Sequence, residues 1–406
     1  PTLTPTLTPT LTPTLTPTLT PTPTEPPIIG TWSLPVTFTG IESNAYFGYD
    51  VSIKGDGNVF AVGSKTTSID TNPGFVEIFT YDLGTTSWIK TATINGTAVN
   101  KTFGHSISLN KNTGDMLVVG DPGYTTNTGI VKVYKQDTSL NWTQIGQDLV
   151  GSNVNDYYGE RVEITPDGNY IIISATQNSS SAKGYVEVYK WNTGTLQWDL
   201  LGTRLIGQAN NDLFGADVSI ALDSLSNLVI AIGAKYNDTG GTNVGQIKTY
   251  VYDLGLLNWV QKGQTLDGIP TPPFAYGLGG VSLNSNGNIL GTISSTGVCK
   301  VYVFDVSSSL WVQRGTDLLN SNATEIVINS TGTVVFIGSG SSSYVVGYMW
   351  NGTSWVQRAS RLSVGSYYWD SFEINDTGDR IILGGGAGSS FGYTLNGEAV
   401  LWDYIP

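Results

Sequence analysis

The chain has very few of the residues that carry metal-binding, redox or nucleophilic chemistry. Its 406 residues include one cysteine, Cys299, and one histidine, His105. A single cysteine excludes a disulfide framework within the chain, and a single histidine excludes a histidine cluster for a metal ion or a catalytic relay. Cys299 lies in an apolar strand pattern and His105 at a loop-to-strand junction, so we expect both to be structural.

Charge is also scarce, and most of it is negative. Charged residues make up 13% of the chain, and the net charge is −13 at pH 7. Such a chain does not neutralise phosphates, so nucleic acid and anionic membrane surfaces are not expected partners. No apolar run reaches the ~18 residues that a transmembrane helix needs. The sequence has no phosphate loop and no metal-type Cys/His spacing, and we expect no enzymatic activity and no cofactor.

The first 27 residues differ in composition from the rest of the chain. The tetrapeptide Pro-Thr-Leu-Thr occurs five times from Pro1 to Thr20, and Pro-Thr-Pro-Thr-Glu-Pro-Pro follows. Regular prolines fix φ and push the preceding residue to extended angles, which favours polyproline II. A period of four on a threefold helix gives no single apolar stripe. We therefore divide the chain into a rod, residues 1–27, and a folded domain, residues 28–406.

Threonine occupies every even position from Thr2 to Thr24, so its hydroxyls face all sides of the rod. This composition suits a sheath of O-glycans, and the alternative is a plain linker. The candidate O-glycosylation sites are Thr2, Thr4, Thr6, Thr8, Thr10, Thr12, Thr14, Thr16, Thr18, Thr20, Thr22 and Thr24. The Asn-X-Ser/Thr sequons, which matter in a secreted protein, are at Asn95, Asn100, Asn141, Asn178, Asn237, Asn322, Asn329, Asn351 and Asn375.

The folded domain repeats one unit of four strands. Each unit opens with a short strand, and seven such strands occur, at residues 51–53, 107–109, 162–164, 218–220, 281–283, 326–328 and 372–374. A tight turn, a strongly apolar second strand and an alternating third strand follow. The fourth strand begins at a tryptophan in six units only: Trp88, Trp142, Trp198, Trp259, Trp311 and Trp355.

The seventh tryptophan stands at the other end of the domain, at Trp32. We therefore expect residues 32–38 to supply the outer strand of the last unit. Four-stranded units with this circular offset predict an all-β, seven-bladed β-propeller closed by its N-terminal strand. Six blades plus a separate strand is the structural alternative. Because an outer strand lies on the rim, the rod is predicted to leave from the rim of the disc.

The openings of the units carry Phe47-Gly48, Phe103-Gly104, Tyr158-Gly159, Phe214-Gly215 and Tyr276-Gly277, and Gly63-Ser64, Gly120-Asp121-Pro122 and Gly233-Ala234 follow later in their units. This pattern resembles the FG-GAP repeat of integrin α-type propellers over residues 28–406, and it departs from that repeat in the last two units. The resemblance implies an extracellular protein.

Such repeats often carry a Ca²⁺ loop. The corresponding turns here offer only one or two carboxylates, so we interpret them as hairpin turns, with a calcium site as the weaker alternative. The rod resembles the Pro/Thr-rich cores of glycosylated extracellular filaments.

These features favour a structural subunit of an extracellular glycosylated filament, with other copies of the chain and attached glycans as partners. The alternative is a stalked adhesin or lectin, for which Tyr367, Tyr368 and Trp369 are the candidate sugar-stacking residues. A third possibility is a propeller glycoside hydrolase, which needs a carboxylate pair. Its candidates near the openings of the units are Asp370, Glu373, Glu160, Glu163 and Asp217, for which we expect solvated or turn-forming roles.

Overall fold

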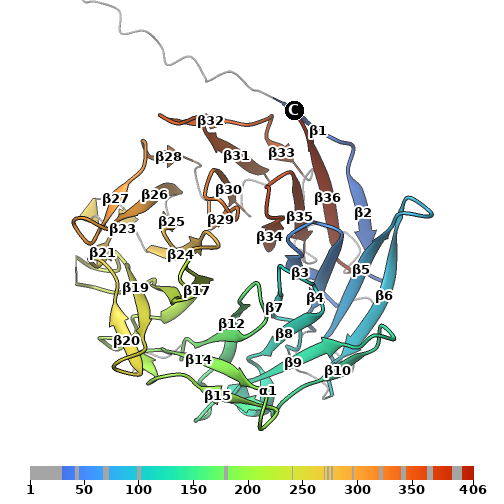
Figure 1. The fold of residues 1–406 in the computed structure, drawn as a ribbon, viewed down its shortest axis with the longest axis horizontal. Helices are drawn as coiled ribbons and strands as arrows, with labels where there is room; N and C mark the ends of the chain where they lie inside the picture. Colours follow the sequence, from blue (N-terminus) through green and yellow to red (C-terminus); the bar gives the residue numbers. More distant parts are fainter. Residues whose placement is uncertain are drawn as a thin grey trace, which may run out of the picture.

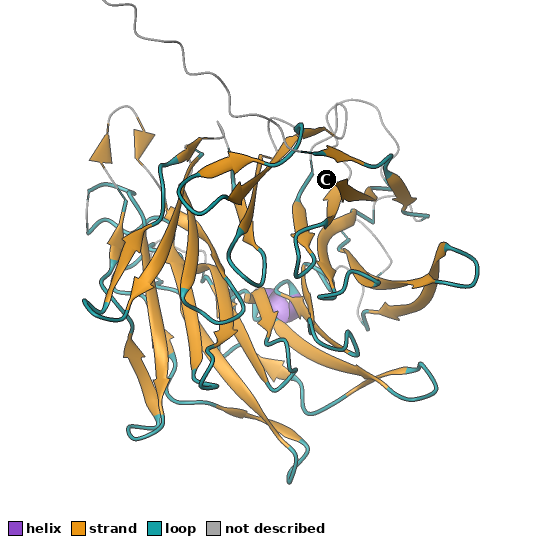
Figure 2. Cartoon of the chain, turned by 45° about the horizontal axis from the view of Figure 1, so that its top comes forward, coloured by secondary structure: helices purple, strands orange, loops and turns teal. Residues whose placement is uncertain are grey.

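The described part of the chain forms seven antiparallel sheets around a central axis, the blades of a β-propeller (Figure 1). This computed structural model describes residues 30–41, 45–66, 73–97, 102–177, 182–239, 241–268, 270–271, 274–275, 278–294, 297–319, 323–339, 344–363, 369–385 and 396–406. The predicted all-β propeller is confirmed, whereas the rod lies outside the described residues. Figure 2 shows that strands dominate every blade, with one short helical turn, α1 (Tyr124–Asn127).

The blades follow one another along the chain. Blade 1 is β3 (Phe47–Ile53), β4 (Val59–Ser64), β5 (Phe75–Asp82) and β6 (Ser87–Asn95), and blade 2 is β7 (Ser106–Leu109), β8 (Met116–Asp121), β9 (Ile130–Gln136), β10 (Trp142–Gln144) and β11 (Leu149–Val150). Blade 3 is β12 (Tyr158–Ile164), β13 (Tyr170–Ala175), β14 (Tyr185–Asn192), β15 (Gln197–Leu200) and β16 (Leu205–Ile206), and blade 4 is β17 (Phe214–Leu222), β18 (Leu228–Ala234), β19 (Gln246–Asp253), β20 (Asn258–Gln261) and β21 (Leu266–Asp267).

A small hairpin of β22 (Pro270–Thr271) and β23 (Phe274–Ala275) leads to the remaining blades. Blade 5 is β24 (Leu278–Leu283), β25 (Ile289–Ser294), β26 (Val298–Asp305), β27 (Leu310–Gln313) and β28 (Leu318–Leu319). Blade 6 is β29 (Glu325–Ile328), β30 (Val334–Ser339), β31 (Tyr344–Trp350), β32 (Trp355–Gln357) and β33 (Leu362–Ser363). Blade 7 combines β34 (Ser371–Ile374), β35 (Arg380–Gly385) and β36 (Glu398–Ile405) with β1 (Thr31–Trp32) and β2 (Val36–Thr39).

The hydrophobic core lies between neighbouring blades. One cluster joins Val118 and Val133 of blade 2 to Ile171 and Trp198 of blade 3, and corresponding clusters recur around the ring. The second strand of each blade contributes most, because it is covered on both faces; β18, for example, is buried along its whole length. This burial accounts for the strongly apolar runs in the sequence.

The outer edge of most blades is a strand broken into two pieces, both of which pair with the third strand. In blade 2, β10 and β11 both pair with β9. In blade 7 the same two positions are filled from the start of the chain, since β1 and β2 both pair with β36. The predicted closure of the ring by residues 32–38 is therefore confirmed, with the added finding that residues 33–35 interrupt the strand.

Candidate functional site

The seven inner strands surround a cavity of about 440 Å³ on the axis of the ring. Carboxyl groups outnumber basic groups in its lining. The acidic residues are Asp50, Glu163, Asp217, Glu325, Asp370, Glu373 and Asp376, and the basic residues are Lys111, Arg161 and Lys235. The cavity is thus the main concentration of titratable groups that the described residues bring together from different blades.

Polar side chains at the centre of five of the inner strands join one blade to the next. The inner strands are not paired with each other as a sheet, so their backbone N–H groups need other acceptors. Serine hydroxyls and one carboxylate accept them: the N–H of Leu109 donates to Ser52 at 3.0 Å, Ile164 to Ser108 at 3.2 Å, Ile220 to Glu163 at 2.9 Å, Leu283 to Ser219 at 3.1 Å and Ile328 to Ser282 at 3.0 Å. The corresponding residue of blade 6 is Val327, which has no acceptor, and the N–H of Ile374 donates to Glu373 of its own blade instead, at 2.9 Å.

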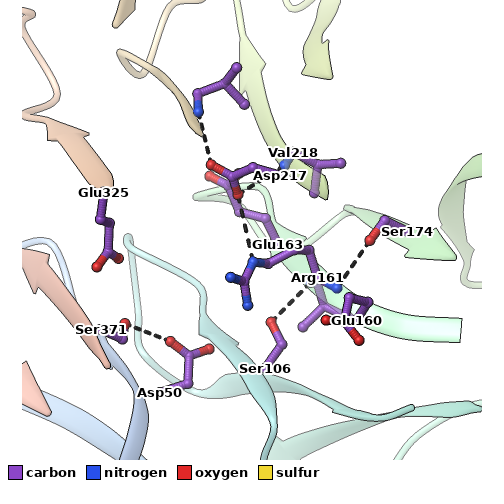
Figure 3. Close-up of polar contacts among 12 residues, drawn as sticks. Asp50, Ser106, Glu160, Arg161, Glu163, Ser174, Asp217, Val218, Glu325 and Ser371 are labelled. Carbon is purple, nitrogen blue, oxygen red and sulfur yellow. Dashed lines mark hydrogen bonds and ion pairs between the residues drawn. The ribbon is translucent and has the colours of Figure 1, made fainter. Parts of the chain in front are cut away.

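A second tier of acceptors lies two residues earlier in four of the inner strands. Asp50 accepts the N–H of Ile107 at 2.7 Å, Asp217 that of Val281 at 2.8 Å, Glu325 that of Phe372 at 3.2 Å and Ser106 that of Val162 at 3.1 Å. Figure 3 shows these groups converging on the axis, with Ser371 donating to Asp50. Most of the channel carboxylates therefore have a structural use, which is to hold neighbouring blades together.

Arg161 and Glu325 extend into the channel from opposite walls (Figure 3). Arg161 Nε lies 3.9 Å from Asp217 Oδ1, and the Arg161 side chain is 44% exposed to the channel. Burial raises the pKa of Asp217 to about 6, against the lowering effect of Arg161, and burial raises the pKa of Glu325 well above its usual range. The site therefore combines a guanidinium donor with carboxyl groups whose pKa values are raised by burial.

Glu163 makes stability depend on pH. Burial raises its pKa from 4.5 to about 8, so between these values the folded state holds a proton that the unfolded state releases. This contribution to stability is full below pH 4.5 and is lost as pH rises through 8. Glu163→Gln keeps an acceptor for the Ile220 N–H and removes the titration. We expect thermal unfolding to show that the free energy of unfolding of the variant rises relative to that of the wild type from pH 5 to pH 9, by on the order of a few kcal/mol. An unchanged difference across that range would contradict this assignment.

The structure brings together four of the five candidate catalytic carboxylates. Glu163, Asp217, Asp370 and Glu373 line the cavity, and Glu160 pairs instead with His105, whose Nε2 lies 3.5 Å from Glu160 Oε1. His105 and Cys299 are both buried. Asp50, Arg161 and Glu325 were not selected from the sequence. Each of them directly precedes the three-residue strand that opens its unit, and this shared position is the signal that could have identified them.

The turns compared with calcium loops are hairpin turns closed by their own side chains. Asp56 pairs with Lys54 at 2.8 Å, and Asp167 accepts the N–H of Asn169 at 3.1 Å. Among the described residues there is no group of three or more His, Cys, Asp or Glu side chains that could hold a metal ion.

The sequons fall into three classes. Asn95, Asn141 and Asn351 are exposed, and Asn100, Asn178 and Asn322 lie outside the described residues. Asn237, Asn329 and Asn375 are buried, which corrects the prediction for these three. Their side-chain oxygens close turns by accepting backbone N–H groups, from Thr239 at 2.9 Å, from Val334 at 2.8 Å and from Arg380 at 3.0 Å. A glycan on any of them is incompatible with the folded blade.

The predicted sugar-stacking cluster is only partly within the described residues. Trp369 is 4% exposed and packs on Phe372, with ring centroids 5.5 Å apart, so its ring is not open to a sugar and the prediction for it is wrong. Tyr367 and Tyr368 lie outside the described residues, as does the Tyr276-Gly277 pair.

The closing strand contacts blades on both sides of blade 7. Trp32 donates its indole N–H to the Ser360 carbonyl of blade 6 at 2.9 Å, and its ring lies 5.8 Å from Phe336. Gly30 forms a parallel bridge with Ala359. The same tryptophan contact recurs at other blade junctions, where Trp259 donates to Leu201 at 3.1 Å and Trp355 to Arg314 at 2.8 Å.

The other end of the closing strand packs on blade 1. Phe38 lies 4.9 Å from Phe60 and 4.9 Å from Phe79, measured between ring centroids. Backbone hydrogen bonds hold the segment to the end of blade 7: the Ser33 N–H donates to the Asp403 carbonyl of β36 at 2.8 Å, and, just after the segment, the Gly40 N–H donates to the Gly397 carbonyl at 3.1 Å. We call residues 30–39 the clasp, because they hold together blades 6, 7 and 1.

Comparison with known families found no family model that matches the chain, and comparison with curated proteins found no significant match. In the part of the chain that the structure describes, no helix is long and apolar enough to span a membrane.

Proposed function

We propose that the chain is a structural subunit of an extracellular, glycosylated filament or surface appendage. The propeller is the folded body, and the rod of residues 1–27 is the element through which copies assemble. One observation carries this proposal: the clasp, which directly follows residues 1–29 in the chain, lies on the rim of the disc and not in the channel (Figure 1). A segment attached there is accessible to neighbouring copies.

Two further features support an extracellular role. Twelve threonines of the rod are available for O-glycans, and Asn95, Asn141 and Asn351 offer exposed sequons on the propeller. The Phe-Gly units, whose glycines pack on the preceding blade, support grouping the domain with FG-GAP-type propellers. Gly48 and Gly384, for example, meet across the junction of blades 1 and 7.

A second candidate function is ligand binding by the propeller, as in an adhesin or lectin. The observation that favours it is the cavity, where Arg161 and Glu325 present donors and acceptors from opposite walls. Because the N–H of Phe372 donates to Glu325 at 3.2 Å, Glu325→Gln keeps an acceptor for that contact and removes the ionisable carboxyl group from the channel.

The test is a glycopeptide map of residues 1–27 by mass spectrometry, combined with electron microscopy of material purified from its source. We expect glycans on several rod threonines and particles joined in linear arrays. A monodisperse protein with unmodified threonines would overturn the structural proposal. If that protein binds a glycan array, and Glu325→Gln abolishes the binding, the ligand-binding function is supported instead.

A further inference from the structure

We propose that the clasp closes the ring of a neighbouring copy, so that copies are joined by exchanged strands. This inference rests on the proposed assembly function and names the contact that performs it. The occupant of the docking surface is residues 30–39 of a second copy of this chain. The docking surface is the outer edge of β36 together with the two aromatic contacts that receive Trp32 and Phe38.

The contacts of the clasp are all with distant parts of the sequence. Its strands β1 and β2 pair with β36, and its two aromatic anchors pack on blades 6 and 1. A clasp from a second copy would make the same strand pairing and the same aromatic contacts, so exchange needs no contacts other than those within one copy. The two half-buried aromatic anchors, Trp32 in β1 and Phe38 in β2, are also of the residue type that dominates binding energy at interfaces.

The clasp can leave without disturbing the rest of the blade. It occupies the outermost position, and β36 remains paired with β35 on its other side from Arg380 to Gly385. The side chains of the clasp are half-buried or exposed, and Leu34 and Val36 are 88% and 42% exposed. In contrast, an inner strand such as β12 is enclosed by the neighbouring blades and cannot be exchanged alone.

Residues 40–46 join the clasp to β3 of its own ring. Seven residues span at most roughly 25 Å when extended, which sets how close a copy that accepts the clasp must lie. The positive φ of Tyr46 is not special to this connection, because Tyr157 and Leu213 also have positive φ at the same position before blades 3 and 4.

Exchange of this kind is directional. Each copy donates one clasp and accepts one, which is a head-to-tail contact that propagates as an open chain unless the rotation closes it into a ring. Residues 1–29, which precede the donated strand, would then start on the accepting copy. The same contact would thereby attach every rod to the next propeller along the chain.

The test mixes two full-length variants that each carry one new cysteine. Thr39 faces Glu398 in the register of β2 and β36, so Thr39→Cys is mixed with Glu398→Cys, and both retain the buried Cys299. The matched control mixes Lys190→Cys with Asp199→Cys, which face each other in β14 and β15 but belong to a hairpin that cannot be exchanged alone. The chain with both Thr39→Cys and Glu398→Cys verifies that the register crosslinks.

We expect a disulfide between residues 39 and 398 of different copies after oxidation, and none between residues 190 and 199 of different copies. If the doubly substituted chain crosslinks within itself as a monomer and the mixed disulfide is absent, strand exchange is wrong. Filaments seen without the mixed disulfide leave the structural function standing with another contact. The mixed disulfide without filaments or glycans supports exchange and overturns that function.

Discussion

Replacing Trp32 by alanine lowers the free energy of unfolding by roughly 3–5 kcal/mol, the usual cost of removing a large aromatic side chain from a packed site. Trp32 is half-buried, yet it contacts Phe336 and Tyr404 at centroid distances of 5.8 and 5.6 Å and donates to the Ser360 carbonyl at 2.9 Å. Its loss weakens the junction of blades 6 and 7. Denaturant unfolding of the purified protein measures the effect.

Leu34→Ala is the matched control for this experiment. Leu34 lies two residues further along the same segment, but it is 88% exposed. We expect its substitution to change the free energy of unfolding by less than about 0.5 kcal/mol, as for other surface positions. Equal effects of the two variants would show that the segment contributes through its backbone alone, and the anchoring role of Trp32 would then be wrong.

Gly120→Ala has the second large effect, because it forces two blades apart. A Cβ at residue 120 overlaps the carbonyl oxygen of Gly159. Gly159 is near the start of β12, the inner strand of the next blade. The obstacle is backbone and cannot rotate away, so the junction of blades 2 and 3 must shift. We expect a loss of at least about 3 kcal/mol, the upper part of the range for overpacked cores, in thermal or denaturant unfolding.

Gly84→Ala is the control for that substitution. Gly84 lies in an exposed turn where an added Cβ comes no closer than 3.3 Å to the Asp82 carboxylate. We expect it to be nearly neutral. A Gly120→Ala protein as stable as the wild type would contradict the close glycine–glycine packing of the blades. The same packing recurs between Gly63 and Gly104, which gives the Phe-Gly pattern a physical reason.

Repetition explains why the architecture was predictable from the sequence. Seven inner strands but only six downstream tryptophans required a seventh tryptophan elsewhere, and Trp32 fills that position beside Tyr404. The interruption of the outer strand at residues 33–35 was not predicted, because nothing in a short exposed strand with alternating residues marks where its pairing stops.

The failures concern residues whose surroundings come from distant parts of the chain. Trp369 looked available because it departs from the repeat. However, Phe372 of its own blade and Gly338 of blade 6 enclose it. Asn329 and Asn375 match a local sequon, but their side chains complete turns inside the fold. Burial of this kind depends on contacts between blades, and local patterns do not report it.

The channel is a second case in which contacts between blades could not be predicted from local sequence patterns. Serines in the centre of apolar strands look unremarkable in the sequence, and their role as acceptors for the next blade appears only when Ser52 meets Leu109 and Ser219 meets Leu283. Blade 6 has Val327 at this position and no acceptor, and Glu373 of blade 7 accepts an N–H of its own blade instead. Of the five carboxylates selected as possible catalysts, Glu163 and Asp217 accept backbone N–H groups of the next blade.

Hydrogen–deuterium exchange of β36 tests most directly whether the clasp is a separate closing element. We expect the peptide covering residues 398–405 to exchange much faster in Trp32→Ala than in Leu34→Ala, while the peptide covering β12 stays equally protected in both. Equal acceleration in β36 and β12 would contradict the account, because the clasp would then be part of one cooperative unit and not an element that can open and rejoin alone.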